Sequence, residues 1–379
     1  MDYQLTEEQE LIINMAREFA ETEVAPKATE VDKNHRFPQE TVARMGELGM
    51  MGIPIPEEYG GSGSDYLTYV MVVEELARAC ATTGVILSVH MSVCTYPIYQ
   101  LGNDYQKEKY VKPLAAGEKL GAFALTEPGA GSDAAAQLTT AVLEGDHYVL
   151  NGTKCFITNG AYADVFIVSA MTDKSKGTKG ISAFIVEKDF PGFSVGQVED
   201  KMGLKGSSTT EIILKDCIVP AENMLGKEGE GFKVAMTALD GGRISIGAQA
   251  VGIAQACLDA SIAYAKERKQ FGKPIASFQA IQFMIAEMAT KIEAARGLVH
   301  HAAWLKDNHL PVTQTSAMAK YFAAETASWC SNRAVQIHGG AGYTTAYPVE
   351  RFMRDAKITE IYEGTTEIQK VVIAASLLR

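Results

Sequence analysis

The residue of greatest chemical interest is a glutamate near the end of the chain. In the segment "ITEIYEGTTEIQKVV" (residues 358–372), Glu363 stands directly before Gly364. An ionised carboxylate on an inward face is costly unless it is paired, hydrogen-bonded or used in chemistry. The apolar positions of this segment look like such a face, and they are Ile358, Ile361, Ile368, Val371 and Val372. We therefore expect Glu363 to be paired, hydrogen-bonded or used in chemistry, with Glu360 and Glu367, which could share a helical face with it, as alternatives for the buried group.

A glycine-rich stretch, "ALTEPGAGSDAAA", has the spacing of a dinucleotide-binding fingerprint. That fingerprint requires a strand before the glycines and a helix after them. Here Pro128 interrupts the approach and the following "QLTTAVLEGDHYVL" alternates like a strand, so we do not expect NAD binding. Two interpretations remain: a glycine-rich turn at a domain junction, or a loop whose backbone N–H groups and Thr126 and Ser132 hydroxyls approach a polar ligand.

The spacing of cysteine and histidine predicts no metal site. The six cysteines are far apart, with no C-x-x-C pair and no Cys/His pair at ligand spacing, so we expect buried free thiols. His300 and His301 are adjacent in a helical pattern, where their side chains diverge by about 100°, and no H-E-x-x-H motif accompanies them.

The composition, 47% apolar and 21% charged, is that of an ordinary soluble globular protein. A formal net charge of −11 without a block of Lys and Arg argues against a nucleic-acid partner. The start, "MDYQLTEEQE", is acidic and lacks the basic and apolar regions of a signal peptide. No apolar run reaches the ~18 residues that span a bilayer, so we expect a cytoplasmic protein without a membrane segment.

The hydrophobic period changes twice along the chain, which predicts a multidomain protein of helices and strands. Residues 1–118 read as a helical domain that opens with a capping box at Thr6. Residues 119–225 carry β-favouring segments with Asn151-Gly152 as the strongest hairpin signal, and without long crossover helices an antiparallel sheet or barrel is expected. Residues 226–379 return to the helical period and predict a domain like a four-helix bundle.

Several long motifs resemble one family. "ALTEPGAGSD" looks like the first signature of the acyl-CoA dehydrogenases, and "QIHGGAGYTTAYPVERFMRDAKI" looks like the second. The motifs "KCFITNG", "EDKMGLKGSSTTEI", "VPAENMLG", "LDGGR", "ERKQFGKPI" and "IYEGTTEIQ" also fall in the family's order. The resemblance covers essentially the whole chain and is strongest to the short-chain, butyryl-CoA-type branch. It implies a flavoprotein oxidoreductase of fatty acid metabolism with FAD as cofactor.

The resemblance implies that FAD lies between the β-domain and the C-terminal helices. Thr126 would bond the flavin ring, and "KCFITNG" would cover its other face. A neighbouring subunit of a homotetramer would hold the pyrophosphate and adenosine, although a solvated cation at a helix end is the plainer interpretation of Arg268. The implied contacts near the flavin are Phe123, Leu125, Thr126, Gly131, Ser132, Phe156, Ile157 and Thr158, with Thr365 and Glu367 also beside the cofactor. The implied contacts from the neighbour are Arg268, Gln270, Phe271, Gln279, Gln336, Gly339 and Gly340.

The resemblance also implies the chemistry. Glu363 would remove the pro-R α-proton of a short-chain acyl-CoA while the β-hydride passes to flavin N5, which gives the trans-2-enoyl-CoA. Desolvation suits a carboxylate to this role because it raises the proton affinity toward the operating pH. The backbone N–H of Glu363 and a ribityl hydroxyl of the flavin would polarise the thioester carbonyl. Some branches carry the base at the position of Gly242, which has no side chain here, so Glu363 stands alone.

The implied substrate contacts are Ser132, Asp240, Arg243, Tyr362, Gly364 and Tyr96. Asp240 and Arg243 would face the pantetheine arm, although an intrahelical ion pair is the plainer explanation. The ring of Tyr96 would close the acyl end of the cavity and favour four-carbon chains. An electron-transfer flavoprotein is the expected partner, and the same site could reduce an enoyl-CoA. A flavin acyl-CoA oxidase and a non-enzymatic CoA-binding protein are the alternatives.

Overall fold

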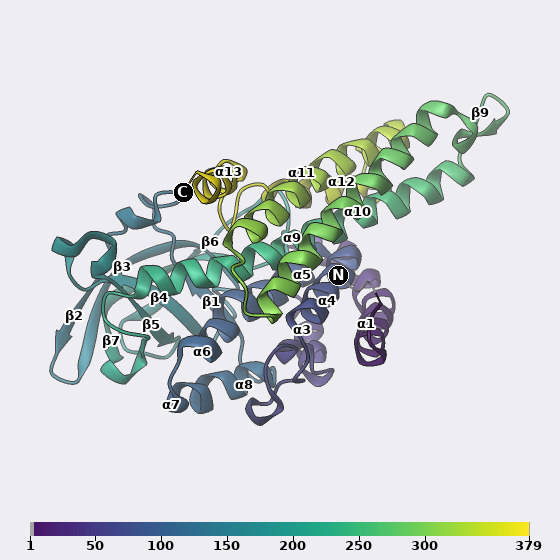
Figure 1. Cartoon of the computed structure of the whole chain (residues 1–379). Coiled ribbons are helices and arrows are strands. Elements are labelled where there is room, and N and C mark those ends of the chain that lie inside the picture. Colours follow the sequence, from purple (N-terminus) through teal and green to yellow (C-terminus); the bar gives the residue numbers. More distant parts are fainter. Residues whose placement is uncertain (1–3, 379) are drawn as a thin grey trace.

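The computed structural model describes residues 4–378, so the first three residues of the acidic N-terminal segment lie outside it. The part that precedes the sheet is helical (Figure 1). Its helices are α1 (Glu7–Phe19), α2 (Ala28–Lys33), α3 (Gln39–Glu47), α4 (Tyr66–Ala79), α5 (Ala81–Ser88), α6 (Tyr96–Leu101), α7 (Asp104–Gln106) and α8 (Lys112–Ala115). The predicted capping box is confirmed, because the Gln9 N–H donates to Thr6 Oγ1 (3.2 Å) and the Thr6 N–H donates to Gln9 Oε1 (3.0 Å).

The middle of the chain forms an eight-stranded sheet with the order β6-β7-β3-β2-β4-β5-β8, in which β1 pairs with β4. The strands are β1 (Gly121–Ala124), β2 (Thr140–Glu144), β3 (His147–Thr158), β4 (Val165–Met171), β5 (Ile181–Glu187), β6 (Phe193–Val198), β7 (Thr209–Pro220) and β8 (Met224–Leu225). Most pairs are antiparallel, as predicted. The sheet is nevertheless mixed, because β1 pairs with β4 in parallel and β2 touches β4 in parallel at one position.

The hairpin predicted at Asn151-Gly152 is wrong. Strand β3 continues through these residues with a register shift between Leu150 and Gly152, and the chain reverses instead at Gly145-Asp146, between β2 and β3. The Asn151 amide is engaged across the sheet, with Oδ1 accepting from the Asp216 N–H at 2.8 Å. A β-carbon on Gly152 would lie 2.7 Å from Thr139 Cβ. The glycine therefore permits a close approach of neighbouring backbone and not a turn.

Strands β4 and β5 are buried on both faces. Val165 and Ile167 belong to the large core shared with the helices, whereas Phe166 and Val168 belong to the core of the β-domain itself. Because successive side chains of a strand point to opposite faces, the two cores lie on opposite sides of β4. The continuous apolar runs of these strands follow from this position, and they join the sheet firmly to the helices.

The long helix α9 (Gly231–Glu267) is the central element of the C-terminal part and packs against α4, α10 and α11. The remaining elements are β9 (Lys269–Gln270), β10 (Lys273–Pro274), α10 (Gln279–Asp307), α11 (Thr313–His338), α12 (Val349–Ile358) and α13 (Thr366–Leu377). Among the described residues, α9 alone has the length and hydropathy of a membrane-spanning helix, but 72% of its most apolar window is buried inside the protein. That burial fits the core helix of a globular fold. The β9–β10 hairpin lies at the far end of the extended α9–α11 helices (Figure 1).

The single inward face predicted for residues 358–372 is wrong. Helix α12 ends at Ile358 and α13 begins at Thr366, so the helical period is interrupted between them. Ile361 is 48% exposed and Val371 is 61% exposed. The interruption matters because it contains Glu363.

Candidate active site

Glu363 lies in the turn between α12 and α13. The hydroxyl of Thr365 caps α13 by accepting a hydrogen bond from the Ile368 N–H (3.3 Å). Glu363 (φ 52°) and Gly364 (φ 89°) both have left-handed backbone conformations. Glycine adopts this conformation readily, but for glutamate it costs energy. Surrounding contacts must therefore hold Glu363 in place.

Two side chains hold this turn from neighbouring helices. Lys320 Nζ, on α11, donates to the Gly364 carbonyl oxygen at 2.7 Å. Gln369 Nε2, on α13, donates to the carbonyl oxygens of Glu363 (3.0 Å) and Gly364 (2.9 Å). Both carbonyls of the turn thus have buried donors, which offset the cost of the backbone conformation.

Tyr362, the residue before Glu363, is anchored to α9. Its hydroxyl donates to Gln249 Oε1 on α9, and Gln249 Nε2 donates to the Ala81 carbonyl oxygen (2.9 Å). Burial raises the pKa of Tyr362 well above its ordinary value, so the phenol keeps its proton. The Tyr362 hydroxyl therefore serves to anchor the residue to Gln249, and the predicted contact with substrate would have to be made by the ring.

The Glu363 carboxylate has the properties of a general base. Its Oε2 atom is buried and has no hydrogen-bond partner among the described residues. Burial raises the pKa of Glu363 to about 7, although Arg243 and Lys320 lower it. A carboxylate with a free oxygen and a proton affinity near neutrality suits proton abstraction at physiological pH.

Gly242 makes room for that carboxylate. A β-carbon at this position of α9 would lie 2.5 Å from Glu363 Oε2 and 2.9 Å from Val93 Cγ1. Val93 belongs to a π-helical segment, Val89–Thr95, that joins α5 to α6. A side chain at position 242, the alternative base position, would therefore occupy the same space as the Glu363 carboxylate. Because residue 242 is glycine, that space is available to Glu363.

The two alternative carboxylates are placed differently. Glu360 pairs with Lys357 (2.5 Å), and Glu367 is exposed in the first turn of α13. The prediction that they could share a helical face with Glu363 is wrong, because residues 359–365 are not helical.

The predicted intrahelical pair of Asp240 and Arg243 is confirmed. Arg243 Nη1 donates to Asp240 Oδ1 (2.7 Å), and Thr313 Oγ1 donates to Asp240 Oδ2 (2.6 Å). The Arg243 Nε atom is buried without a hydrogen-bond partner among the described residues. Arg243 thus retains a free donor beside the Glu363 carboxylate, whose pKa it lowers.

Tyr96 lies in a cluster of tyrosine rings with Tyr66 and Tyr99. Its ring centroid is 5.3 Å from that of Tyr66, and Lys306 Nζ lies 4.5 Å from the Tyr96 centroid. The Tyr66 hydroxyl donates to the carbonyl oxygen of Gly241, the residue before Gly242. Tyr96 is thus connected to the backbone beside Gly242 through the Tyr66 ring, and its closure of the acyl end of the cavity stays a prediction.

The two loops predicted to flank the flavin lie side by side. The Cys155 N–H donates to the Thr126 carbonyl oxygen at 2.9 Å. Lys154 Nζ is fully buried and donates to the Leu125 carbonyl oxygen (3.0 Å) and to Glu127 Oε1 (2.8 Å). Burial lowers the pKa of Lys154 to about 8, although Glu127 raises it. This buried ion pair fixes the two motifs relative to each other.

These loops fit a large planar cofactor with a polar tail. A β-carbon on Gly129 or Gly131 would meet nothing within 4 Å among the described residues, so the loop is open to a ligand. Phe156 is 63% exposed with φ 58°, which presents a bare ring on a left-handed backbone. Ser132 is exposed, and Phe123, Thr126 and Thr158 are half-buried. The Ile157 side chain, by contrast, lies in the β-domain core, so its backbone alone could face the predicted flavin.

The residues predicted to reach FAD from a neighbour gather at the far end of α9–α11. Arg268 follows α9, and Phe271, between β9 and β10, is 93% exposed. The Tyr264 ring stacks on the His338 ring, with 4.2 Å between the ring centroids, and this contact joins the ends of α9 and α11. Gln270, Gln279, Gln336, Gly339 and Gly340 are also exposed there. Helix α9 rises roughly 39 Å between the levels of Glu363 and Arg268, at about 1.5 Å per residue, so one chain does not bring these sets together.

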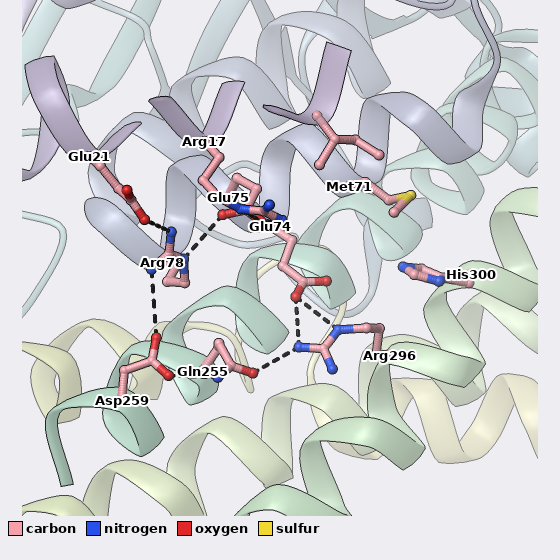
Figure 2. Close-up of a pocket in the computed structure, with 11 residues that line it drawn as sticks. Arg17, Glu21, Met71, Glu74, Glu75, Arg78, Gln255, Asp259, Arg296 and His300 are labelled. Carbon is pink, nitrogen blue, oxygen red and sulfur yellow. Dashed lines mark hydrogen bonds and ion pairs between the residues drawn. The ribbon is translucent and has the colours of Figure 1, made fainter. Parts of the chain in front are cut away.

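Among the described residues, two cavities are not lined by Glu363 itself. A cavity of about 220 Å³ is lined by Thr365 and Glu367, which the sequence assigns to the cofactor. A larger cavity of about 410 Å³ is lined by residues of α1, α4, α9 and α10 (Figure 2). Its charged side chains pair with one another, for example Arg296 with Glu74 at 2.8 Å. The larger cavity is therefore a junction braced by ion pairs and is remote from the predicted chemistry.

Sequence reasoning missed five side chains of this site. They are Lys320, Gln249, Gln369, Lys154 and Glu127. A signal for the first was present, since Lys320 is the single charge in the apolar run "SAMAKYFAA". A single lysine in a largely apolar helical run is expected to be buried, and a buried ammonium group needs a hydrogen-bond or ionic partner.

Known proteins match the chain over its whole length. Family models described as the N-terminal, middle and C-terminal domains of acyl-CoA dehydrogenase match residues 6–118, 122–217 and 229–378. A short-chain specific acyl-CoA dehydrogenase of Clostridium acetobutylicum is 59% identical, with 100% of both chains covered. The butyryl-CoA dehydrogenase structure of Megasphaera elsdenii is 51% identical with a TM-score of 0.99, with 100% of both chains covered. A chain in a structure described as an electron transferring flavoprotein of Acidaminococcus fermentans is 57% identical, with a TM-score of 0.99 and 100% coverage of both chains.

Proposed function

This chain belongs to the acyl-CoA dehydrogenase family, and from that premise we propose that Glu363 is the base that removes the α-proton of a bound acyl-CoA. The protein is an FAD-dependent enzyme that dehydrogenates short-chain acyl-CoA thioesters or catalyses the reverse reduction. The observation that carries the assignment of the base is the Oε2 of Glu363, which is buried opposite Gly242 and has no hydrogen-bond partner in the described part of the chain.

The turn around Glu363 prepares the carboxylate for proton transfer. Tyr362, Lys320 and Gln369 fix the backbone on both sides of the base, so little motion is needed to reach the substrate. Gly364 lets the thioester approach the turn closely, and the Glu363 N–H is the proposed donor to the thioester carbonyl oxygen. Polarising that oxygen acidifies the α-proton, which Glu363 then accepts.

FAD, when bound, supplies the acceptor for the β-hydride. We assign the open loop from Phe123 to Ser132 to one side of the flavin and the exposed Phe156 with Thr158 to the other. Thr365 and Glu367, beside the cavity of about 220 Å³, complete the contacts proposed within one chain. Arg243, with its free Nε, and Asp240 are assigned to the pantetheine arm of CoA.

A homotetramer is the proposed assembly. The exposed set around Arg268 and Phe271 is roughly 39 Å along α9 from the level of Glu363, which supports its use at the FAD of a second copy. Arginine is suited to the pyrophosphate because its guanidinium binds phosphate oxygens in a fixed geometry. A bare phenylalanine at a hairpin tip is likewise typical of a residue that a partner covers.

Three further assignments accompany this function. An electron-transferring flavoprotein is the proposed electron partner, and the cytoplasm is the proposed location. The proposed domain boundaries are residues 1–118, 119–225 and 226–379. No nucleic acid or membrane is assigned as a partner.

An anaerobic titration of the purified flavoprotein with butyryl-, hexanoyl- and octanoyl-CoA tests the function. Butyryl-CoA should bleach the flavin most effectively, because each methylene excluded by the Tyr96 wall forfeits ~0.8 kcal/mol of burial. A clear preference for octanoyl-CoA would contradict the short cavity. Rapid reoxidation by oxygen with stoichiometric peroxide would indicate an acyl-CoA oxidase. A colourless protein that FAD does not reconstitute would indicate a CoA-binding protein without catalysis.

A further inference from the structure

A buried cation supports the catalytic turn from behind. The Lys320 side chain is fully buried on α11, and its Nζ donates to the Gly364 carbonyl oxygen at 2.7 Å. Its neighbours along the helix, "SAMA" before it and "YFAA" after it, offer little to solvate an ammonium group. A buried ammonium is retained at a cost, which indicates that the protein uses either its charge or its hydrogen bond.

The charged groups around this cation include the base. Glu363, Glu360 and Glu367 raise the pKa of Lys320 and Arg243 lowers it, but burial is the largest influence and brings the pKa to about 7. Around the Glu363 carboxylate, the cations that lower its pKa are Arg243 and Lys320. The phenols of Tyr66, Tyr69 and Tyr362 also lie in its field, and burial raises their pKa values, so they remain neutral.

The two cations near the base are not equivalent. Arg243 is already paired with Asp240 at 2.7 Å, which offsets much of its charge. Lys320 instead binds the backbone of the turn that carries the base. Gln369 binds the same carbonyl oxygen at 2.9 Å but is neutral. Lys320 therefore combines a positive charge with a hydrogen bond to the Gly364 carbonyl oxygen, whereas Gln369 makes the hydrogen bond without a charge.

On the assignment of Glu363 as the base, we propose that Lys320 is a positioning residue for it. The Lys320 ammonium holds the left-handed Glu363–Gly364 turn through the Gly364 carbonyl, and its charge favours the ionised, proton-accepting form of the carboxylate. Gln369 shares the first role and lacks the second.

The sign of the expected pH effect follows from this arrangement. Glu363 accepts a proton only when it is ionised, so the rate of flavin reduction rises with pH through the pKa of the carboxylate. Up to about pH 7, where Lys320 still carries its proton, removing its positive charge raises the pKa of Glu363 and moves the rise to higher pH. Removing the amide of Gln369 loosens the turn without removing a charge, so the rate falls at every pH and the rise stays in place.

Stopped-flow reduction of the holoenzyme by butyryl-CoA, measured across pH, tests the proposal. In Lys320→Met we expect the rise to shift upward by ~1 pH unit. At pH 7 reduction should then be at least ~5-fold slower, with the Kd for butyryl-CoA little changed. Gln369→Met should be slower without a shift. Lys112→Met, which removes an exposed lysine paired with Glu108, is the control for loss of one charge and should match the wild type.

An unshifted profile in Lys320→Met would overturn the proposal. If that variant does not fold, Lys320→Arg tests the proposal instead, because it keeps the positive charge. The larger guanidinium group can lower the rate of flavin reduction, but the rise of that rate with pH should stay near its wild-type position. An upward shift in Lys320→Arg equally overturns the proposal. Fast reduction in Glu363→Gln would instead show that the base is elsewhere, which is a failure of the proposed function and separable from the role of Lys320.

Discussion

A β-carbon at position 242 would lie 2.5 Å from Glu363 Oε2, so the carboxylate occupies space that exists because residue 242 is glycine. The contact joins the middle of the chain to its end, and it explains why a helix-weakening residue stands inside α9. Gly242 and Glu363 are in this sense one functional unit.

Gly242→Ala should therefore abolish most activity without unfolding the protein. The methyl group would displace the Glu363 carboxylate, and a small misplacement of a base costs on the order of 10²-fold in rate. The measurement is the rate constant of flavin reduction by butyryl-CoA, together with the thermal unfolding midpoint. Gly297→Ala is the matched control, because a β-carbon there meets nothing within 4 Å among the described residues and should leave the rate unchanged. Equal activity in both variants would contradict the role given to Gly242.

Glu363→Gln tests the base directly. The amide keeps the size of the side chain but cannot accept the α-proton, so butyryl-CoA should bind while flavin reduction falls by at least ~10²–10⁴. Binding and reduction are followed separately by absorbance of the flavin. Glu360→Gln and Glu367→Gln should retain proton abstraction, since Glu360 pairs with Lys357 and Glu367 is exposed. Rapid bleaching in Glu363→Gln would place the base on another residue.

The stability of the protein should also report the state of Glu363. Burial raises its pKa from 4.5 to about 7, so the folded state holds a proton that the unfolded state releases between these values. This contribution to stability is fully present below pH 4.5 and is lost as pH rises through about 7. Glu363→Gln should thus exceed the wild type in free energy of unfolding at pH 8, by on the order of 1–3 kcal/mol, and lose this advantage toward pH 4.5. Denaturant titrations at pH 4.5 and pH 8 measure the difference in free energy of unfolding between the variant and the wild type. A difference that does not change with pH would argue against a raised pKa of Glu363 in the folded protein.

Arg268→Ala should weaken FAD retention and oligomer stability together. The residue is exposed at the end of α9 and is assigned to the pyrophosphate at a second copy's site. FAD loss on gel filtration and the mass of the eluted species are the two measurements. Lys33→Ala, a substitution at the end of α2 in the N-terminal part, controls for loss of a cation. A well-folded monomer with undiminished FAD affinity would refute the assignment between subunits.

Lys154→Met should destabilise the β-domain and loosen the flavin loops. The substitution leaves the buried Glu127 without its cation, and breaking one side of a buried pair costs about 3–5 kcal/mol. Glu127 keeps hydrogen bonds from the backbone N–H groups of Leu138 (2.6 Å) and Thr139 (3.0 Å), so the lower end of this range is expected. Denaturant unfolding gives the cost, and FAD release during the titration should precede global unfolding. The double variant Lys154→Met with Glu127→Gln should recover part of the loss, because neither charge remains.

The sequence alone determined the order of the elements and pointed to Glu363 as the proposed base. The capping box at Thr6, the succession of helices, strands and helices, and the intrahelical pair of Asp240 and Arg243 rest on residues close together in the chain. Local periodicity and side-chain spacing encode such features directly. Glu363 was identifiable because a carboxylate before a glycine stands out in an apolar segment and matches a family motif.

Tertiary structure decided how these parts meet. Asn151-Gly152 has the composition of a turn, yet the approach of Thr139 and the pairing with Asp216 keep it inside β3. The left-handed backbone of Glu363 and the hydrogen bond from Lys320 likewise depend on contacts between distant segments. Local propensity is worth at most about 1 kcal/mol per residue and yields to such packing. The sequence therefore pointed to Glu363, whereas the fold supplied the room for its carboxylate at Gly242, its burial and the nearby cation of Lys320.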